Sequence, residues 1–338
     1  MNFAKVEKIA AAILYEGYIL YPYRPSAIKN RQRWNFGTLY PRAYAEARRP
    51  QEPYRFVAEC LVEECTEETE LDIRIQFLQL MQKRGEASGR EASGSSDDRM
   101  HGPREPSLEW DEAVEWGSDV TGLRLEDRAG HPLMVDLQMR TSVQPEAAGV
   151  GETSAGIEAC LGVGVERLST GLLKVRLELQ NQTQLANGAR ATREEALPHA
   201  FVSAHALLGV RNGRFVSLLD PPESYREAVA GCGNTGVFPV LAGDETERTM
   251  MFCSPIILYD YPKIAPESEG DFFDGTEMDE MLTLRVLTLT EAEKQEVREG
   301  DARARRILER TESLTAESMM KAHGVIRGMR DIRREDAR

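Results

Sequence analysis

Alternating apolar and polar residues along the chain predict β-strands. The clearest strand covers residues 172–183, where apolar side chains alternate with charged or amide side chains. Its apolar positions are Leu173, Val175, Leu177 and Leu179. Because successive side chains of a strand point to opposite faces, this pattern is typical of an antiparallel sheet with one face in water.

Further strands are expected before and after this one. They cover residues 71–78, 122–127, 133–139 and 251–259, and residues 7–23 are expected to form two strands around a turn at Glu16-Gly17. Residues 200–210 and 214–219 are expected to pair as a hairpin, because Asn212-Gly213 between them favours a two-residue hairpin turn. Residues 54–66 fit both helical and strand periodicity, so both alternatives stay open.

Helices are expected mainly at the C-terminus. Thr290 and Glu293 have the capping-box spacing that begins a helix. Residues 302–310 contain good helix formers, and residues 315–329 place apolar side chains on one helical face. A short helix over residues 223–230 precedes them. Strands and helices together predict an α+β protein, predominantly antiparallel β-sheet with a helical C-terminus.

A change in composition divides the chain. Residues 84–107 are rich in glycine, serine and charge, so they are expected to form a flexible linker. Residues 142–156 are expected to form a loop. The predicted organisation is a β-rich part over 1–83 that holds a basic-aromatic segment, the linker over 84–107, a β-rich domain over 108–289 and C-terminal helices over 290–338.

Composition argues against several classes of protein. Acidic residues outnumber basic ones, 56 against 42, which gives a formal net charge of −14. A general nucleic-acid binder needs a basic face, so nucleic acid is not an expected partner. No apolar run reaches the roughly 18 residues of a membrane span, and the N-terminus lacks the pattern of a signal peptide. Five cysteines at irregular spacing favour a reduced, cytoplasmic setting over a disulfide framework.

No motif predicts a catalytic site, a metal site or a cofactor. The five histidines are scattered, and the cysteines lack the spacing of a zinc or iron–sulfur site. Gly231, Gly233 and Gly236 match the letters of a dinucleotide-binding motif, but a predicted helix precedes them where that motif needs a strand. Acidic residues crowd positions 267–280 and could hold a hard cation. The residue order of a calcium loop is absent there, so a solvated loop is the simpler interpretation.

A basic-aromatic segment from Arg24 to Arg42 is the main candidate for binding a partner. Its candidate contact residues are Lys29, Arg31, Arg33, Trp34 and Phe36. Arginine pairs with anions and stacks on rings, and arginine and tryptophan are enriched at binding hot spots, so this segment could dock an acidic protein. The alternatives are a loop that packs its rings on the core and a nucleic-acid clamp. Six glutamates between Glu59 and Glu70 could complement the segment or form a solvated face.

Several strings of sequence together resemble one family. They are LYEGYILYPYR at 14–24, KN at 29–30 with RWNFG at 33–37, SLLDPP at 217–222, SPIILYDYP at 254–262 and FDGTEMDEML at 273–282. The family is an uncharacterised one whose proteins are encoded beside actinobacterial-type uptake [NiFe]-hydrogenase structural and maturation genes. The resemblance spans most of residues 9–310 and leaves out the linker.

The resemblance implies an accessory or assembly protein of a [NiFe]-hydrogenase system that acts by binding protein. Its implied partners are hydrogenase subunits or maturation proteins, and it supplies no catalytic residue. Hydrogenase subunits that carry nickel or iron–sulfur clusters hold them through grouped cysteines, which this chain lacks. An enzyme of unknown reaction, with an unrecognised site, is the alternative.

The docking hypothesis predicts the effect of two charge reversals. Arg31→Glu combined with Arg33→Glu should weaken capture of an acidic partner and make capture less sensitive to salt, without lowering the melting temperature. Trp34→Ala separates docking from packing, because the loss of a core ring costs about 3–5 kcal/mol of stability whereas the loss of a docking ring lowers partner capture alone. Partner capture that survives both charge reversals would rule out docking through this segment.

Overall fold

The computed structural model describes residues 3–16, 21–24, 36–82, 111–141, 156–264, 279–299 and 302–314. It confirms the predicted fold class, since the protein is α+β, rich in antiparallel sheet, with helices at the C-terminus. The chain forms two compact units. One unit comprises Met1–Tyr18 and Gln32–Lys263, and the other comprises Ile19–Arg31 and Ile264–Arg338.

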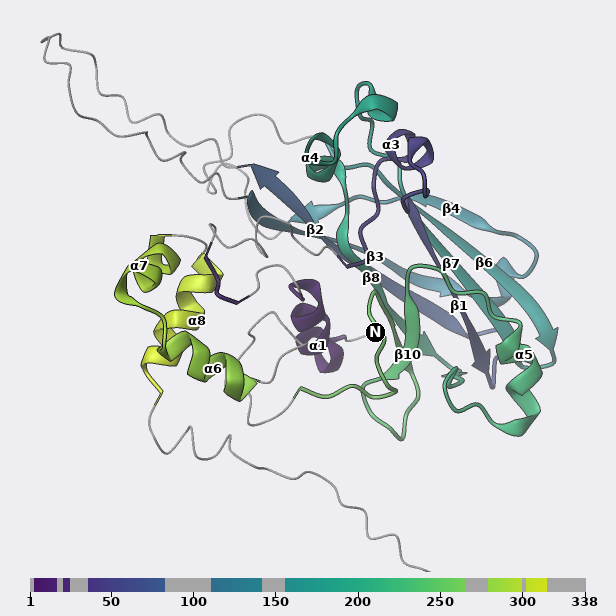
Figure 1. Ribbon diagram of the computed structural model, residues 1–338. Helices are drawn as coiled ribbons and strands as arrows, with labels where there is room; N and C mark the ends of the chain where they lie inside the picture. Colours follow the sequence, from purple (N-terminus) through teal and green to yellow (C-terminus); the bar gives the residue numbers. More distant parts are fainter. Residues whose placement is uncertain are drawn as a thin grey trace, which may run out of the picture. The chain divides into compact units, whose positions relative to one another are not determined.

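Two antiparallel sheets make up most of the first unit (Figure 1). The strands are β1 (Arg55–Glu63), β2 (Glu70–Gln82), β3 (Asp111–Arg124), β4 (Leu133–Asp136), β5 (Arg140–Thr141), β6 (Ala159–Ser169), β7 (Leu172–Asn181), β8 (Val202–Arg211), β9 (Arg214–Phe215), β10 (Phe238–Ala242) and β11 (Met250–Ser254). One sheet has the order β4-β6-β7-β1-β9, and the other has the order β10-β11-β8-β2-β3-β5. Strands from both sides of residues 84–107 therefore share a sheet, because β2 lies between β3 and β8.

A single apolar layer fills the space between the sheets. Every second residue of β7 contributes to it, and these are the four apolar positions that the sequence pattern predicted, all 0% exposed. Alternate residues of β1, β2, β6, β8 and β11 join the same core. The rings of Phe77 and Phe201 stack within it, with centroids 4.1 Å apart. Replacing one such leucine by alanine costs about 2–5 kcal/mol, so this layer supplies much of the stability of the unit.

Strand β1 settles the ambiguity of residues 54–66 in favour of a strand. Its residues are buried on both faces from Phe56 to Val62, so the alternation that marks a half-exposed strand is lost. The cover on the outer face includes a 3₁₀ turn, Glu223–Tyr225, and the short helix α5 (Arg226–Ala230), which pack near Leu61. This helical segment lies where the sequence predicts a helix over residues 223–230.

The predicted hairpin around Asn212-Gly213 is wrong. Strand β8 lies inside its sheet between β2 and β11, so neither of its edges is free to accept β9. The chain instead crosses to the other sheet, where Phe215 of β9 pairs opposite Val62 of β1. Asn212 has a φ of 55°, but Gly213 lacks the positive φ that a type I′ hairpin turn needs at both central residues.

The predicted strand pair over residues 7–23 is also wrong, because Ala4–Leu14 forms helix α1. Phe3, Val6, Ala10 and Ile13 recur at helical spacing and are buried. They pack on the outer face of the six-stranded sheet, against Leu207, Val240, Met250 and Phe252. An apolar run rich in alanine suits a helix once a sheet is present to cover one side of it.

Shorter elements complete the first unit. They are helices α3 (Arg42–Ala47) and α4 (Arg193–Ala196) and 3₁₀ turns at Glu126–Arg128, Gly188–Arg190 and Leu197–His199. Strand β4 ends at Asp136 and β11 ends at Ser254, so the strands predicted over 133–139 and 251–259 end earlier than expected.

The second unit contains the C-terminal helices α6 (Asp279–Leu287), α7 (Glu291–Glu299) and α8 (Ala302–Glu312). The predicted capping box is present, since Thr290 N donates to Glu293 Oε2 at 2.9 Å and Glu293 N donates to Thr290 Oγ1 at 3.3 Å. Residues Tyr21–Arg24 belong to this unit, and the Arg24 guanidinium pairs with Glu293 at 3.1 Å. The predicted linker (84–107), the predicted helix over 315–329 and residues 142–155 of the predicted loop lie outside the described residues.

Two further sequence expectations concern described residues. No helix in the described part of the chain is long and apolar enough to cross a membrane. All five cysteines are present as free thiols, and Cys60, Cys160 and Cys253 are buried.

His205 is a buried titratable group beneath α1. Its ring is 0% exposed and meets the Phe252 ring edge-on at 5.3 Å. Its Nδ1 lies 2.7 Å from the carbonyl oxygen of Ser203, and Ser203 Oγ donates to the carbonyl of Ile13. Burial lowers the pKa of His205 to about 4, so the imidazole is neutral at pH 7. This arrangement indicates a structural role for Ser203 and His205.

The buried imidazole predicts acid sensitivity. The unfolded chain binds a proton at His205 below a pKa of about 6.5 and the folded chain only below about 4, so stability should fall as the pH falls through this window. Between pH 7 and about pH 4.5 this group should account for about 2 to 3 kcal/mol of lost unfolding free energy. Urea unfolding of wild type and His205→Gln measures it, with exposed His131→Gln as control. An equal pH dependence in wild type and His205→Gln would contradict this assignment.

Candidate binding groove

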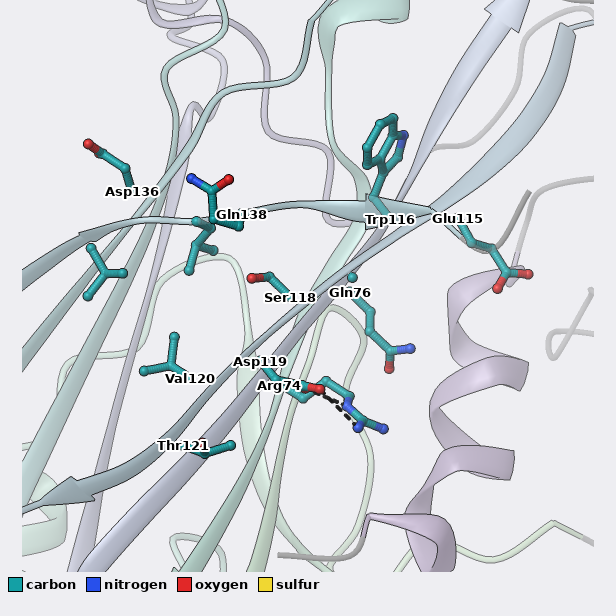
Figure 2. Close-up of a pocket in the computed structure, with 13 residues that line it drawn as sticks. Arg74, Gln76, Glu115, Trp116, Ser118, Asp119, Val120, Thr121, Asp136 and Gln138 are labelled. Atoms are coloured by element: carbon teal, nitrogen blue, oxygen red, sulfur yellow. Dashed lines mark hydrogen bonds and ion pairs between the residues drawn. The ribbon is translucent and has the colours of Figure 1, made fainter. Parts of the chain in front are cut away.

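An open groove of about 570 Å³ lies beside β3 in the first unit. Its walls come from Arg74 and Gln76 of β2, residues 115–121 of β3 and residues 135–138 at the end of β4 (Figure 2). Strand β3 belongs to the six-stranded sheet and β4 to the five-stranded sheet. The groove therefore lies at the open side of the sandwich, where one sheet stops beside the other.

Two strand edges border the groove. Strand β3 pairs with β2 from Glu70↔Arg124 to Gln82↔Asp111, but on its other side β5 reaches only Trp116 and Gly117. Within the described residues, positions 118–120, 123 and 124 of β3 thus pair on one side only, and a bulge at Thr121-Gly122 interrupts this edge. Strand β4 is the outermost strand of its sheet and pairs with β6 alone. Such edges offer backbone N–H and C=O groups to another strand.

Arg74 ties the groove to helix α1. Its guanidinium contacts Asp119 at 2.7 Å and Glu7 of α1 at 2.6 Å, and it lies over the ring of Phe3. Hydrogen bonding to Asp119 is the largest cause that raises the pKa of Arg74, so this group stays charged. Figure 2 shows Arg74 and Asp119 facing each other across neighbouring strands.

Acidic residues outnumber basic ones in the described lining of the groove. Its lining contains Glu115, Asp119 and Asp136 against a single basic residue, Arg74. Glu115 accepts a hydrogen bond from the hydroxyl of Tyr15. The one guanidinium is shared by Asp119 and Glu7, so little positive charge is left over for a bound molecule. A positively charged group is consequently the better match for this lining.

Trp116 forms a fixed apolar wall. Its indole Nε1 donates to Gln79 Oε1 at 3.0 Å, and Gln79 Nε2 donates to the carbonyl of Pro198 at 2.7 Å. Trp116 and Val120 pack against the core between the sheets, so this face of β3 is apolar while the face that carries Asp119 is charged.

Asp136 is the exposed carboxylate at the β4 side. It stands opposite Cys160 of β6 in the sheet. Burial and this carboxylate raise the pKa of the Cys160 thiol, which therefore stays protonated and is a poor nucleophile.

The chemistry that the groove offers is backbone hydrogen bonding, an apolar wall and negative charge, which suits binding of a polypeptide segment.

The basic-aromatic segment is described only in part. Lys29, Arg31, Arg33 and Trp34 lie outside the described residues, so their docking role stays a prediction. Phe36 is partly buried, and its carbonyl accepts a hydrogen bond from Ser203 N at 2.8 Å. Phe36 does not line the groove.

The acidic run contacts arginines of the chain itself. Four of its members form ion pairs, namely Glu59 with Arg176, Glu63 with Arg248, Glu64 with Arg214 and Glu70 with Arg211. This run is therefore largely neutralised within the sandwich.

The glycine-rich turn follows α5 and lies against β1, as Val57 and Thr235 form an isolated bridge. Glu59 Oε2 accepts a hydrogen bond from Gly233 N at 2.7 Å, so this backbone N–H already has a carboxylate partner within the chain. This geometry supports the interpretation as a structural turn.

Metal ligands do not gather in the part of the chain that the structure describes, where no group of three or more His, Cys, Asp or Glu side chains could hold an ion. The acidic stretch at 267–280 lies outside that part up to residue 278.

Sequence reasoning missed the groove. Strand β3 begins at Asp111, well before the strand predicted at 122–127. Val114, Trp116 and Val120 alternate with polar residues, which is the pattern that could have revealed it. The limit of β5 pairing at Gly117 has no counterpart in the sequence pattern.

Compared with known proteins, the chain matches no family model and no curated protein sequence.

The Arg74 ion pairs predict a salt-dependent loss of stability. Arg74→Met leaves Asp119 and Glu7 without their shared cation, so the free energy of unfolding should drop by about 1 kcal/mol. The deficit should shrink in about 1 M NaCl, because salt screens the carboxylates. Urea titration at two salt concentrations measures it. Arg55→Met, which removes one ion pair to Glu178 on the other sheet, is the matched control with a smaller effect. A deficit in Arg74→Met that salt does not change would contradict an electrostatic origin.

Proposed function

We propose that this protein is an accessory or assembly protein of a [NiFe]-hydrogenase system and that it acts by binding other proteins. The groove beside β3 is the observation that carries the binding role, because its described lining joins a strand edge to an apolar wall and to acidic side chains. The hydrogenase system is suggested by the sequence resemblance. Hydrogenase subunits or maturation proteins are the proposed partners.

Residues of the resembling strings contact one another in the sandwich unit. Ser217 Oγ donates to Asp260 Oδ2 at 2.5 Å, and the other oxygen of Asp260 accepts from Leu241 N. Gly37 has a φ of +52°, and a Cβ there would lie 2.5 Å from Pro255, so glycine is required at this close approach. Contacts of this kind explain how separate strings can mark one shared fold.

A similar contact occurs in the helical unit. The Arg285 guanidinium of α6 lies 5.7 Å from the centre of the Tyr21 ring, and Arg24 also pairs with Glu296 of α7. The string at 14–24 and the chain that follows the string at 273–282 are thus joined. These contacts hold the two segments together within the helical unit.

The proposed setting is the cytoplasm, which agrees with five free thiols and the acidic composition. The basic-aromatic segment, with Lys29, Arg31, Arg33, Trp34 and Phe36, is a second proposed docking surface, for an acidic region of a partner. The two surfaces have opposite charge, so they would select different regions of one partner or different partners.

Deletion of the gene tests the proposal. The deletion strain should lose hydrogenase activity or accumulate unprocessed large subunit, and the wild-type gene should restore both. The purified protein should also capture separately purified hydrogenase subunits or maturation proteins in a pull-down. Normal activity and processing in the deletion strain, together with no capture, would refute the accessory role.

A further inference from the structure

We propose that an arginine-rich surface around α3 and α4 binds an acidic segment of a partner protein. This arginine surface comprises Arg48, Arg49, Arg190 and Arg193, together with the rings of Tyr40 and Tyr44. The chemistry of the bound segment follows from the surface alone, whereas the protein that supplies the segment rests on the proposed function.

Close packing brings the two halves of this surface together, although they are far apart in sequence. Gly188 is so close to α3 that an added Cβ would be 3.0 Å from an alanine side chain of that helix. Arg48 donates a hydrogen bond to the carbonyl oxygen of Ala191, and Arg193 Nε donates to the Tyr40 hydroxyl at 3.1 Å. Helices α3 and α4 accordingly lie side by side (Figure 1).

Two buried tyrosine rings hold two of the guanidinium groups in place. Tyr40 and Tyr44 are 3% and 4% exposed, and their ring centroids lie 5.0 Å apart. The guanidinium carbon of Arg48 lies 4.1 Å from the centre of the Tyr44 ring, and Arg193 is held by the Tyr40 hydroxyl. Side chains that are already held in place lose less conformational entropy when they bind an anion, which favours binding.

None of the four arginines forms an ion pair in the part of the chain that the structure describes. Arg49 Nη1, for example, donates to the backbone carbonyl oxygen of Glu46 at 2.9 Å. Neighbouring arginines differ in this respect, since Arg42 pairs with the Glu46 carboxylate at 2.7 Å and Arg55 pairs with Glu178. The charge of the arginine surface is therefore available to a carboxylate from another molecule.

Most carboxylates near the surface already have partners. Glu195 Oε2 accepts a hydrogen bond from Thr192 N at 2.8 Å, and hydrogen bonds with its own backbone N–H and with Thr192 lower the pKa of Glu194. Glu52 is the exception, because it forms no ion pair among the described residues. Burial is the largest cause that raises the pKa of Tyr40, and the charge of Glu52 adds to it. Glu52 is thus the acidic group that would oppose an incoming carboxylate.

The arginine surface continues the basic-aromatic segment along the sequence. That segment runs from Arg24 to Arg42 and so includes Tyr40. Residues 25–39 contain three basic residues and no acidic residue. The segment and the surface therefore carry the same sign of charge, and both match an acidic partner.

The burial of the tyrosine rings favours a polypeptide over a nucleic acid. Single-stranded nucleic acids stack their bases on accessible aromatic rings, whereas Tyr40 and Tyr44 are covered. A net charge of −14 also opposes the many phosphate contacts that a long polyanion needs. A guanidinium matches a carboxylate through two parallel hydrogen bonds, so a short run of aspartate and glutamate is the better fit.

Matched synthetic peptides test the inference on the full-length protein. The probe is the acetylated, amidated peptide Ser-Glu-Asp-Glu-Asp-Glu-Asp-Ser, and its control carries glutamine and asparagine in place of each acid. Fluorescence anisotropy should show binding of the acidic peptide, at least about tenfold weaker binding of the control, and a loss of affinity as NaCl is added. Absence of binding would show that the surface is occupied or does not recognise carboxylates, and either result would overturn the proposal.

Two exposed arginines locate the binding site. Arg49→Gln combined with Arg190→Gln should weaken binding of the acidic peptide about fivefold and leave the melting temperature unchanged, because neither side chain forms an ion pair. Arg124→Gln is the matched control, since Arg124 is an exposed arginine of β3 outside the surface, and its affinity should equal that of wild type. Equal affinities of wild type and the double variant would overturn the site.

Two further measurements test the sign of the charge and the class of partner. Glu52→Gln should strengthen binding of the acidic peptide about twofold, because it removes a like charge beside Tyr40. Weaker binding in this variant would contradict the assigned electrostatics. A single-stranded oligothymidylate with the same net charge as the peptide should bind more weakly than the peptide, and tighter binding of the oligonucleotide would overturn a polypeptide ligand.

A pull-down separates this inference from the proposed function. Hydrogenase subunits captured equally by wild type and by the Arg49→Gln, Arg190→Gln variant would retain the accessory role and overturn the arginine surface as its binding site. Binding of the acidic peptide without capture of any hydrogenase or maturation protein would retain the arginine surface and refute the proposed system.

Discussion

The apolar layer between the two sheets is the constraint on which the sandwich unit depends. It fixes the register of every strand that contributes to it, because a slip by one residue would turn Lys174 and Arg176 of β7 into the core. It also requires the two sheets to lie face to face, so their outermost strands stop beside each other. The groove beside β3 follows from that arrangement, since it occupies the side where β4 ends one sheet and where β3, with its short partner β5, lies at the margin of the other.

The sequence predicted strands that have one buried and one exposed face, and helix ends that are held by local hydrogen bonds. Strand β7 was predictable because one of its faces is in water, and the capping box of α7 because its hydrogen bonds are local. Strand β1 was ambiguous because it is buried on both faces. Helix α1 and the crossing at Asn212 were mispredicted because their geometry is imposed by distant neighbours, the outer sheet face for α1 and the strands β2 and β11 for β8. The groove was harder still to predict from sequence, because it depends on the residue at which the pairing between β3 and β5 ends.

Ion pairing decides which acidic cluster can act on a partner. The run from Glu59 to Glu70 is the more conspicuous in sequence, yet four of its six glutamates form ion pairs with arginines of the same unit. The groove draws its acidic residues from β3 and from the end of β4, and no pattern in either segment marks them as a group. A net charge of −14 therefore does not locate the region of strongest negative electrostatic potential. The positions of the arginines, which pair with some carboxylates and leave others, are more informative.

The open edge of β3 also has a consequence for how copies of the protein behave toward each other. An unpaired edge is a template for any extended chain, including the same edge of a second molecule, and charged side chains are a common protection against such pairing. Two copies that met edge to edge would bring Asp119 and Asp136 of each close to the same acidic groups of the other. The carboxylates that favour a basic partner thus discourage self-association. Through the charge of its flanking side chains, the edge thus discriminates between a second copy of the protein and a partner of opposite charge.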